Sequence, residues 1–109
     1  MDIKEIGKKV NDMINCQDAK EREWQYNNVV TPALCKNYDM TYAFIKQITK
    51  EQMIELSGGM EEVVEHFNKE ELADLIIERY NTLVGTDENQ VDFETMRTLK
   101  DFINLSKNN

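Results

Sequence analysis

The sequence predicts an all-α protein: a single compact domain of about five or six short-to-medium helices, with one irregular loop near residues 25–38. The chain of 109 residues contains one proline and four glycines. These are too few turn residues for an all-β fold, which needs a turn about every 8 to 12 positions. Apolar residues recur at helical spacing along most of the chain. Because this length suits one domain, we expect residues 1–109 to form one helical unit.

Residues 1–24 are predicted to form an N-terminal helix, and its clearest part is residues 2–20. Its apolar side chains share one helical face; they are Ile3, Ile6, Val10, Met13 and Ile14. Asp2 suits the N-cap, where a side-chain oxygen accepts a hydrogen bond from a free N–H of the first turn. We therefore expect an amphipathic helix with one buried side.

Residues 25–38 are the least regular part of the sequence. Asn27 and Asn28 interrupt the apolar pattern, and Thr31-Pro32 suits the N-cap and first position of a short helical turn over residues 32–36. Aromatic residues flank the stretch, namely Trp24, Tyr26 and Tyr38. We expect an irregular loop that these aromatic rings hold against the helices.

Residues 39–106 are predicted to be helical and acidic, followed by a frayed tail over 107–109. Apolar spacing divides this region into helices at 40–48, 50–56, 60–67, 69–84 and 93–106. Asp39 opens the first of them. Thr49 and Gln52 have the spacing of a capping box, in which each side chain bonds the other residue's backbone N–H.

Other local signals mark where these helices end and begin. Gly58-Gly59 is expected to end the helix 50–56 with a glycine in the left-handed conformation, and Gly85 to end the long helix. Asn68, three residues before Glu71, marks the start of the long helix. Asp92 suits the N-cap of the last helix, and the stretch 86–91 reads as a polar loop.

Charge is the most informative property of this sequence, because the formal net charge of −8 is unevenly distributed. Residues 1–50 contain eight Lys or Arg and seven Asp or Glu, a net charge of +1. Residues 51–109 contain five and fourteen, a net charge of −9. A field of that sign repels phosphate backbones, so direct nucleic-acid binding through residues 51–109 is not expected.

A basic protein surface is therefore the expected partner of the second half of the chain. The candidate partner-binding residues are the acids between positions 51 and 78: Glu51, Glu55, Glu61, Glu62, Glu65, Glu70, Glu71, Asp74 and Glu78. The sequence favours a non-enzymatic interaction or regulatory protein that docks this acidic helical face on a basic, nucleic-acid-binding partner. Inhibitors encoded by phages or mobile elements are one such class. An ordinary solvated helix surface remains the simplest alternative reading of the same acids.

A second hypothesis is a self-associating helical protein with a structural role. The predicted helix 69–84 has an apolar stripe broader than one packing face needs; it consists of Leu72, Leu75, Ile76, Ile77, Tyr80, Leu83 and Val84. Such a stripe could join two copies of the chain as a homo-oligomer.

No catalytic residue, cofactor site or metal site is predicted. Cys16, Cys35 and His66 are the only cysteine and histidine side chains, and no nearby pattern supplies the orienting group that catalysis requires. The two cysteines lack the CxxC spacing of a zinc site, and no secretion signal favours a disulfide, so we expect reduced thiols in a cytoplasmic protein. An enzyme is therefore not expected.

Two helical motifs are considered and rejected. The apolar spacing of Glu70–Ile103 is similar to that of an EF-hand, but Val84, Asn89 and Thr95 occupy positions where calcium binding needs Asp, Gly and Glu. Residues 50–67 have the lengths of a helix-turn-helix, but the would-be recognition helix carries three glutamates and no base-reading side chain. The chain has no apolar run of membrane-spanning length and no signal-peptide pattern at its start.

Overall fold

The computed structural model describes residues 2–85, 96, 98–101 and 103. Every regular element within these residues is helical, which confirms the all-α class. Some helices follow one another without a gap, and each such run counts as one segment. The described residues then form five continuous helical segments. The radius of gyration is 13.4 Å, close to the value of about 13 Å for a compact domain of 100 residues. The chain is therefore a single globule.

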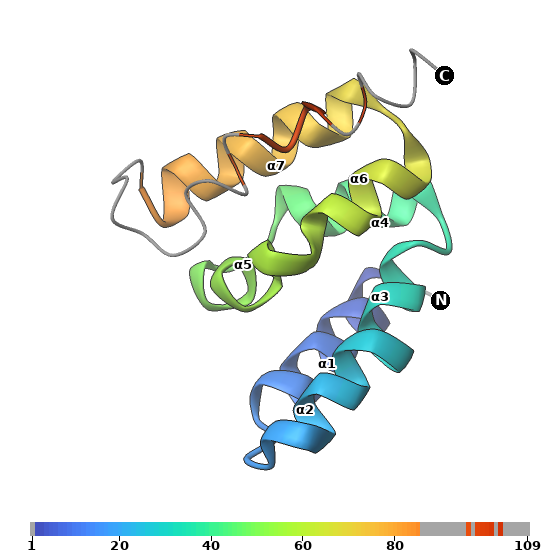
Figure 1. The fold of residues 1–109 in the computed structure, drawn as a ribbon, viewed down its shortest axis with the longest axis vertical. Helices are drawn as coiled ribbons and strands as arrows, with labels where there is room; N and C mark the ends of the chain where they lie inside the picture. Colours follow the sequence, from blue (N-terminus) through green and yellow to red (C-terminus); the bar gives the residue numbers. More distant parts are fainter. Residues whose placement is uncertain (1, 86–95, 97, 102, 104–109) are drawn as a thin grey trace.

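The elements follow one another with short connections. They are α1 (Ile3–Ile14), α2 (Ala19–Gln25), the π-helical turn η1 (Tyr26–Val30), α3 (Thr31–Leu34), α4 (Tyr38–Lys46), α5 (Lys50–Leu56), the 3-10 turn η2 (Ser57–Gly59), α6 (Met60–Phe67) and α7 (Glu70–Leu83). In Figure 1, α1 and the continuous α2–η1–α3 helix form a hairpin, and α4 to α7 form a second group above it. No described helix has both the length and the apolar character needed to cross a membrane.

The irregular loop predicted for residues 25–38 is wrong, because the chain stays helical as far as Leu34. The backbone N–H of Thr31 donates to the carbonyl of Tyr26, five residues earlier, which is the spacing of a π turn. Proline inside an α-helix lacks an N–H and collides with the carbonyl four residues earlier. The wider π turn directly before Pro32 accommodates both defects. Val30 and Leu34, buried in the core, hold this segment in place.

Several predicted helix caps are confirmed, and others lie elsewhere. Asp2 accepts a hydrogen bond from the Glu5 N–H at 3.0 Å. Thr49 and Gln52 form both bonds of the capping box, at 3.2 and 3.1 Å. The expected N-terminal helix over 1–24 is divided after Ile14, and Asp18 caps α2. Asn37, and not Asp39, caps α4, because its side chain accepts from the Met40 N–H at 3.0 Å.

The double glycine ends α5 as predicted, but not through a left-handed residue. Gly59 has a φ of −112°, which any residue can adopt. Glycine is needed at this position because the Tyr26 ring packs directly against the Gly59 backbone. A Cβ at Gly59 would lie 2.5 Å from Cζ of Tyr26. The left-handed position is Asn68, at φ 53° and ψ 45°, which ends α6 and leaves Lys69 as the N-cap of α7. Gly85, at φ 120°, follows the end of α7 as predicted.

The core lies between the hairpin and the second group of helices, and all described helical segments contribute to it. Its largest fully buried side chains are Tyr80, Ile6, Met13, Ile45, Ile48, Met53, Leu56, Met60, Leu72, Ile76, Leu99 and Ile103. Buried polar side chains fix how the elements meet. Thr41 donates its hydroxyl to the Leu34 carbonyl at 2.6 Å, and Gln52 donates its amide to the Asn11 side chain at 3.1 Å. These bonds tie α4 to α3 and α5 to α1.

The C-terminal part of the chain is described only at a few positions. Met96, Leu99 and Ile103 are buried in the common core, as their spacing within the predicted helix 93–106 implies. The continuous α-helix predicted over 93–106 is wrong at residues 98–100, which form a turn whose backbone bonds join residues three positions apart, such as Asp101 N–H to the Thr98 carbonyl at 3.0 Å. The other positions of that stretch, apart from 96, 101 and 103, lie outside the described residues, as do Asp92, the polar loop 86–91 and the tail 107–109. Most of the loop similar to that of an EF-hand lies outside them as well.

Candidate protein-interaction surface

The nine acids predicted to bind a partner lie on three helices. Glu51 and Glu55 belong to α5, the next three to α6, and the last four to α7. Seven are exposed, while Glu55 and Glu61 are half-buried. The sequence therefore predicts correctly that these carboxylates lie at the surface.

Helix ends account for five of the nine acids. Glu51 stands in the first turn of α5, Glu61 and Glu62 in that of α6, and Glu70 and Glu71 in that of α7. The partial positive charge of a helix N-terminus stabilises such carboxylates by about 0.3–1 kcal/mol each. These five positions have a structural purpose whether or not a partner binds.

Local partners account for further acids. Arg22 approaches Glu55 at 3.9 Å, and Lys100 pairs with Asp74 at 2.9 Å and with Glu70 at 3.2 Å. The bonds to Asp74 and Glu70 raise the pKa of Lys100 above its usual value. Glu71 accepts the hydroxyl of Tyr38 at 2.8 Å. Exposed ion pairs of this kind contribute at most about 1 kcal/mol, so these acids remain open to exchange with a partner's cations.

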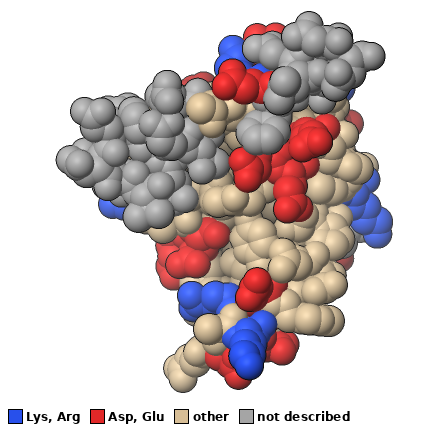
Figure 2. All heavy atoms as spheres, viewed as in Figure 1, with Lys and Arg blue, Asp and Glu red and all other residues tan. Residues whose placement is uncertain are grey.

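The α6 ridge, which we define as Glu61, Glu62 and Glu65, has no such partner among the residues that the structure describes. None of its carboxylates forms an ion pair with any residue that the structure describes. Glu65 lies one turn from both others, and like charges at that spacing destabilise a helix by about 0.2–0.5 kcal/mol per pair. In Figure 2, acidic side chains gather where Figure 1 draws α6, while acidic and basic side chains alternate over the hairpin below.

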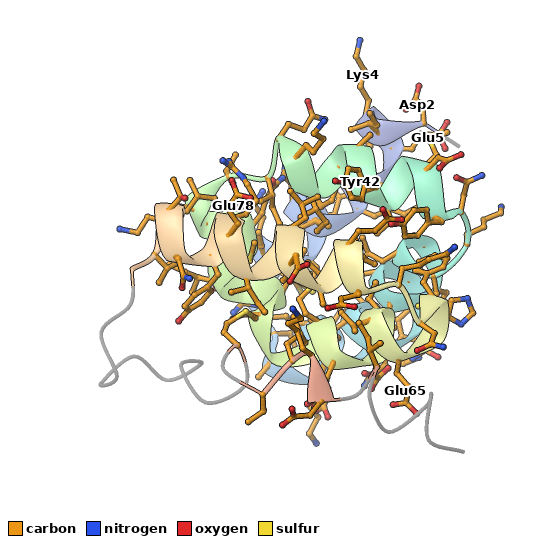
Figure 3. The ribbon with its side chains drawn as sticks, turned by 90° about the horizontal axis from the view of Figure 1, so that it is seen from above. Asp2, Lys4, Glu5, Tyr42, Glu65 and Glu78 are labelled. Carbon is orange, nitrogen blue, oxygen red and sulfur yellow. The ribbon has the colours of Figure 1, made fainter. Side chains whose placement is uncertain are left out.

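The nine acids do not form one compact face. Figure 3 labels Glu65 on α6 and Glu78 on α7, and the two lie on well-separated parts of the molecule. The α6 ridge and the α7 acids near Glu78 therefore belong to different parts of the surface. A single small binding patch on a partner can contact the α6 ridge or the α7 acids near Glu78, but not both. The order of these acids in the sequence does not show this division.

The structure separates the two cysteines. Cys16 follows α1 and Cys35 follows α3, so the helical segment between them places them about 20 Å apart. Both are free thiols. Burial, and then the nearby Glu62 carboxylate, raise the pKa of Cys35 above its usual 9.0, which disfavours the reactive thiolate. His66 is exposed on α6 and packs edge-on against Phe67, with the ring centroids 4.8 Å apart.

The apolar stripe behind the self-association hypothesis is used within the chain. Leu72, Ile76 and Tyr80 are fully buried. The wider members of the stripe are partly buried against the same core: Leu75, Ile77, Leu83 and Val84. Several helices cover α7, so a broad stripe is what one chain needs here. This stripe therefore gives no separate reason to expect a second copy.

Two surface hollows were not foreseen from the sequence. A groove of about 450 Å³ beside α4 is lined by Tyr38, Asp39, Tyr42, Ala43, Lys46 and Glu71. The spacing of Tyr38, Tyr42 and Lys46, one turn apart along a helix, was the available signal for it.

Trp24, which was expected to hold a loop, is instead 55% exposed on α2.

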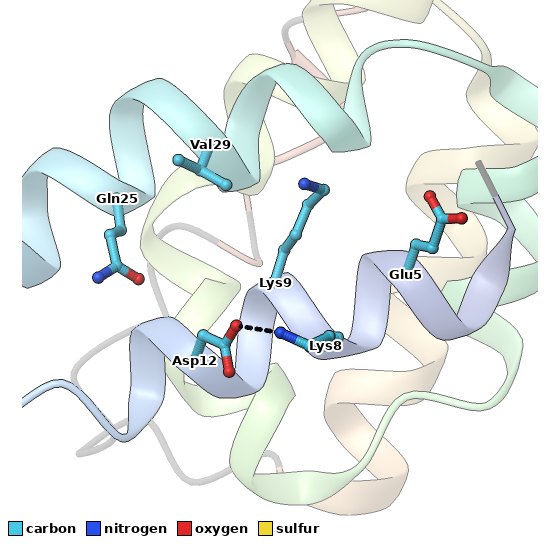
Figure 4. Close-up of a pocket in the computed structure, with 6 residues that line it drawn as sticks. All are labelled: Glu5, Lys8, Lys9, Asp12, Gln25 and Val29. Atoms are coloured by element: carbon cyan, nitrogen blue, oxygen red, sulfur yellow. Dashed lines mark hydrogen bonds and ion pairs between the residues drawn. The ribbon is translucent and has the colours of Figure 1, made fainter.

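The second hollow, of about 220 Å³, lies between α1 and the η1 turn (Figure 4), and its lining residues are Glu5, Lys8, Lys9, Asp12, Gln25 and Val29. Lys8 is already paired with Asp12 at 3.0 Å. Two acids and two lysines line this hollow, and no aromatic side chain is among its lining residues.

Within the described residues, no group of His, Cys, Asp and Glu side chains is arranged to hold a metal ion. Comparison with known proteins finds no matching family model, no matching curated protein and no matching solved structure. The surface chemistry of the chain is therefore the basis for a proposal of function.

Proposed function

We propose that this chain is a non-enzymatic interaction protein that binds a basic surface of a partner protein through the α6 ridge. The observation that carries the proposal is a row of exposed or half-buried carboxylates that lack a cation among the described residues. Repulsion between Glu65 and each of the other two carboxylates opposes the favourable interaction of Glu61 and Glu62 with the N-terminus of α6. A partner's lysines and arginines would remove that repulsion on binding.

A partner whose basic surface normally binds nucleic acid fits this chemistry best. Such a surface has clustered lysines and arginines that neutralise phosphates, and the α6 ridge presents carboxylates instead. A complex would then exclude nucleic acid from that surface. Opposite fields steer the two proteins together, so the association rate should fall steeply as the salt concentration rises.

The test is capture from an extract of the source organism on the immobilised protein, washed at increasing salt. We compare wild type with a ridge variant, Glu61→Gln/Glu62→Gln/Glu65→Gln. The matched control is Glu5→Gln/Glu21→Gln/Glu23→Gln, which changes the net charge equally. It also replaces two first-turn acids and one later acid, all three exposed.

The expected result is a basic protein that wild type and control retain and the ridge variant loses. Its retention should fall between about 0.1 M and 1 M salt, over which the Debye length shortens from about 10 Å to about 3 Å. Equal retention by the ridge variant and the control would contradict the role of the α6 ridge. Retention that is independent of salt would contradict the electrostatic mechanism.

A further inference from the structure

The groove beside α4 has an aromatic wall with a fixed geometry. Tyr38 and Tyr42 stand one helical turn apart, with ring centroids 5.9 Å apart and an angle of 41° between the rings. Phe67 packs edge-on against Tyr38 at 5.4 Å, and all three rings contact the core. Aromatic side chains held in this way can bind without losing much further conformational freedom.

Cations already lie over both tyrosine rings. The Lys46 ammonium is 5.7 Å from the centre of the Tyr42 ring, and the Lys69 ammonium is 5.8 Å from that of Tyr38. Both lysines are exposed, and an exposed cation–π contact of this kind changes a population only about two- to fivefold. A cation from another molecule can therefore displace either lysine.

Carboxylates stand at the edge of the same groove. Glu71 uses one oxygen to accept the Tyr38 hydroxyl, and its second oxygen accepts no hydrogen bond from the described residues. Asp39 is exposed and has no ion-pair partner among them. Asp74 and Glu78 continue the acidic side of α7, three and seven residues after Glu71. Figure 3 shows Tyr42 and Glu78 along the line where α4 and α7 meet.

We propose that this groove binds an arginine side chain from a basic segment of the partner protein. The planar guanidinium group can stack on Tyr42 while it donates hydrogen bonds to a carboxylate of Asp39 or Glu71. The compact ammonium of lysine cannot do both in the same way. This inference rests on the proposed function, because it names the side chain that the groove would select in a partner already attracted by the acidic surface.

The test uses two synthetic probes, a glycine–serine peptide with four spaced arginines and its lysine counterpart. Affinities and the NMR shifts of the tyrosine rings are measured at low salt. The arginine peptide should bind about two- to fivefold more tightly than the lysine peptide and should shift the ring signals of Tyr38 and Tyr42. Tyr42→Leu should abolish this preference, while Tyr42→Phe and Trp24→Leu should keep it.

A second pair of variants works even if Tyr42→Leu fails to fold. Lys46→Gln removes the competing cation and should strengthen binding of the arginine peptide, whereas Lys4→Gln makes the same change of charge at an exposed residue of α1 that does not line the groove. An equal effect of Lys46→Gln and Lys4→Gln would overturn the proposal. So would equal affinity for both peptides, or no binding of either. These outcomes leave the capture experiment unaffected, so failure of the groove and failure of the α6 ridge are distinguishable.

Discussion

Substitution of Gly59 by alanine should destabilise the protein, although alanine is the better helix former. A Cβ at this position would meet the Tyr26 ring, at 2.5 Å from Cζ and 2.7 Å from Cε1. Forcing atoms into a packed site costs about 1–3 kcal/mol. Displacement of the ring also breaks the hydrogen bond from the Tyr26 hydroxyl to the Leu56 carbonyl, 3.2 Å long, for about 1 kcal/mol more. The lower backbone entropy of alanine offsets about 0.5–1 kcal/mol.

The net loss of about 1–3.5 kcal/mol is measurable by urea denaturation and thermal melting. A change of 1 kcal/mol shifts the Tm of a domain near this size by about 4–8 °C, so Tm should fall by at least about 4 °C. Gly7→Ala is the matched control, because a Cβ there meets only Phe44, at an ordinary 3.9 Å. Inside α1 it should stabilise the fold by about 0.5–1 kcal/mol.

A double-mutant cycle identifies the cause. In a Tyr26→Leu background the ring is absent, so Gly59→Ala should become nearly neutral, and the difference measures the coupling of the two positions. The reasoning is refuted if Gly59→Ala is as stable as wild type. It is also refuted if the loss is the same with and without the tyrosine.

Three further predictions concern the caps, the acids and a thiol. Thr49→Ala removes one bond of the capping box and should lower the free energy of unfolding by about 1 kcal/mol in urea denaturation; no loss would contradict the cap. Glu65→Gln should raise the free energy of unfolding by about 0.4–1 kcal/mol through the loss of two like-charge contacts, and a lower Tm would count against this. Burial raises the pKa of Cys35, so at pH 9 iodoacetamide should modify Cys35 more slowly in the folded than in the urea-unfolded chain, as peptide mass spectrometry can show. The Cys35 thiol therefore makes its full contribution to the free energy of unfolding below pH 9.0, the usual pKa of the thiol. This contribution declines as the pH rises toward the higher pKa of Cys35 in the folded chain.

Local signals in the sequence predicted much of the fold. Asp2 and the pair Thr49–Gln52 form the expected caps because capping depends on residues three positions apart. The apolar stripes of α1 and α7 are buried as expected, since helical periodicity alone decides which face is apolar. These features need no knowledge of the tertiary structure.

Residues 26–34 show where local reasoning fails. The pair of asparagines and Pro32 are unfavourable in an α-helix, yet the chain is helical there. The π turn and the packing of Val30 and Leu34 in the core depend on elements distant in the sequence. The same holds for Gly59, whose partner Tyr26 is 33 positions away.

The sequence predicted the candidate surfaces only in part, because their arrangement also depends on contacts between elements that are distant in the sequence. Exposure of the nine acids followed from their positions on helices, but the separation of Glu65 from Glu78 depends on how α6 and α7 pack in the folded chain. The sequence does not predict the tyrosine groove, because its pattern places Tyr38 at the end of the predicted loop 25–38 and not on the same helix as Tyr42. Only the packed structure shows Tyr38 and Tyr42 on one helix beside Glu71.

The π turn also bears on how this chain tolerates changes in length. It contains one residue more than an α-helical turn, and each residue of an α-helix rotates the next by about 100°. Arg22 and Tyr26, before or at the turn, contact α5 and its carboxyl end, while Leu34 after it is buried. The wider turn absorbs that extra residue, so deletion of exposed Asn27 would convert the segment to a regular α-helix and leave these groups facing their present neighbours. An insertion elsewhere in α2 would need a second such turn to keep them aligned.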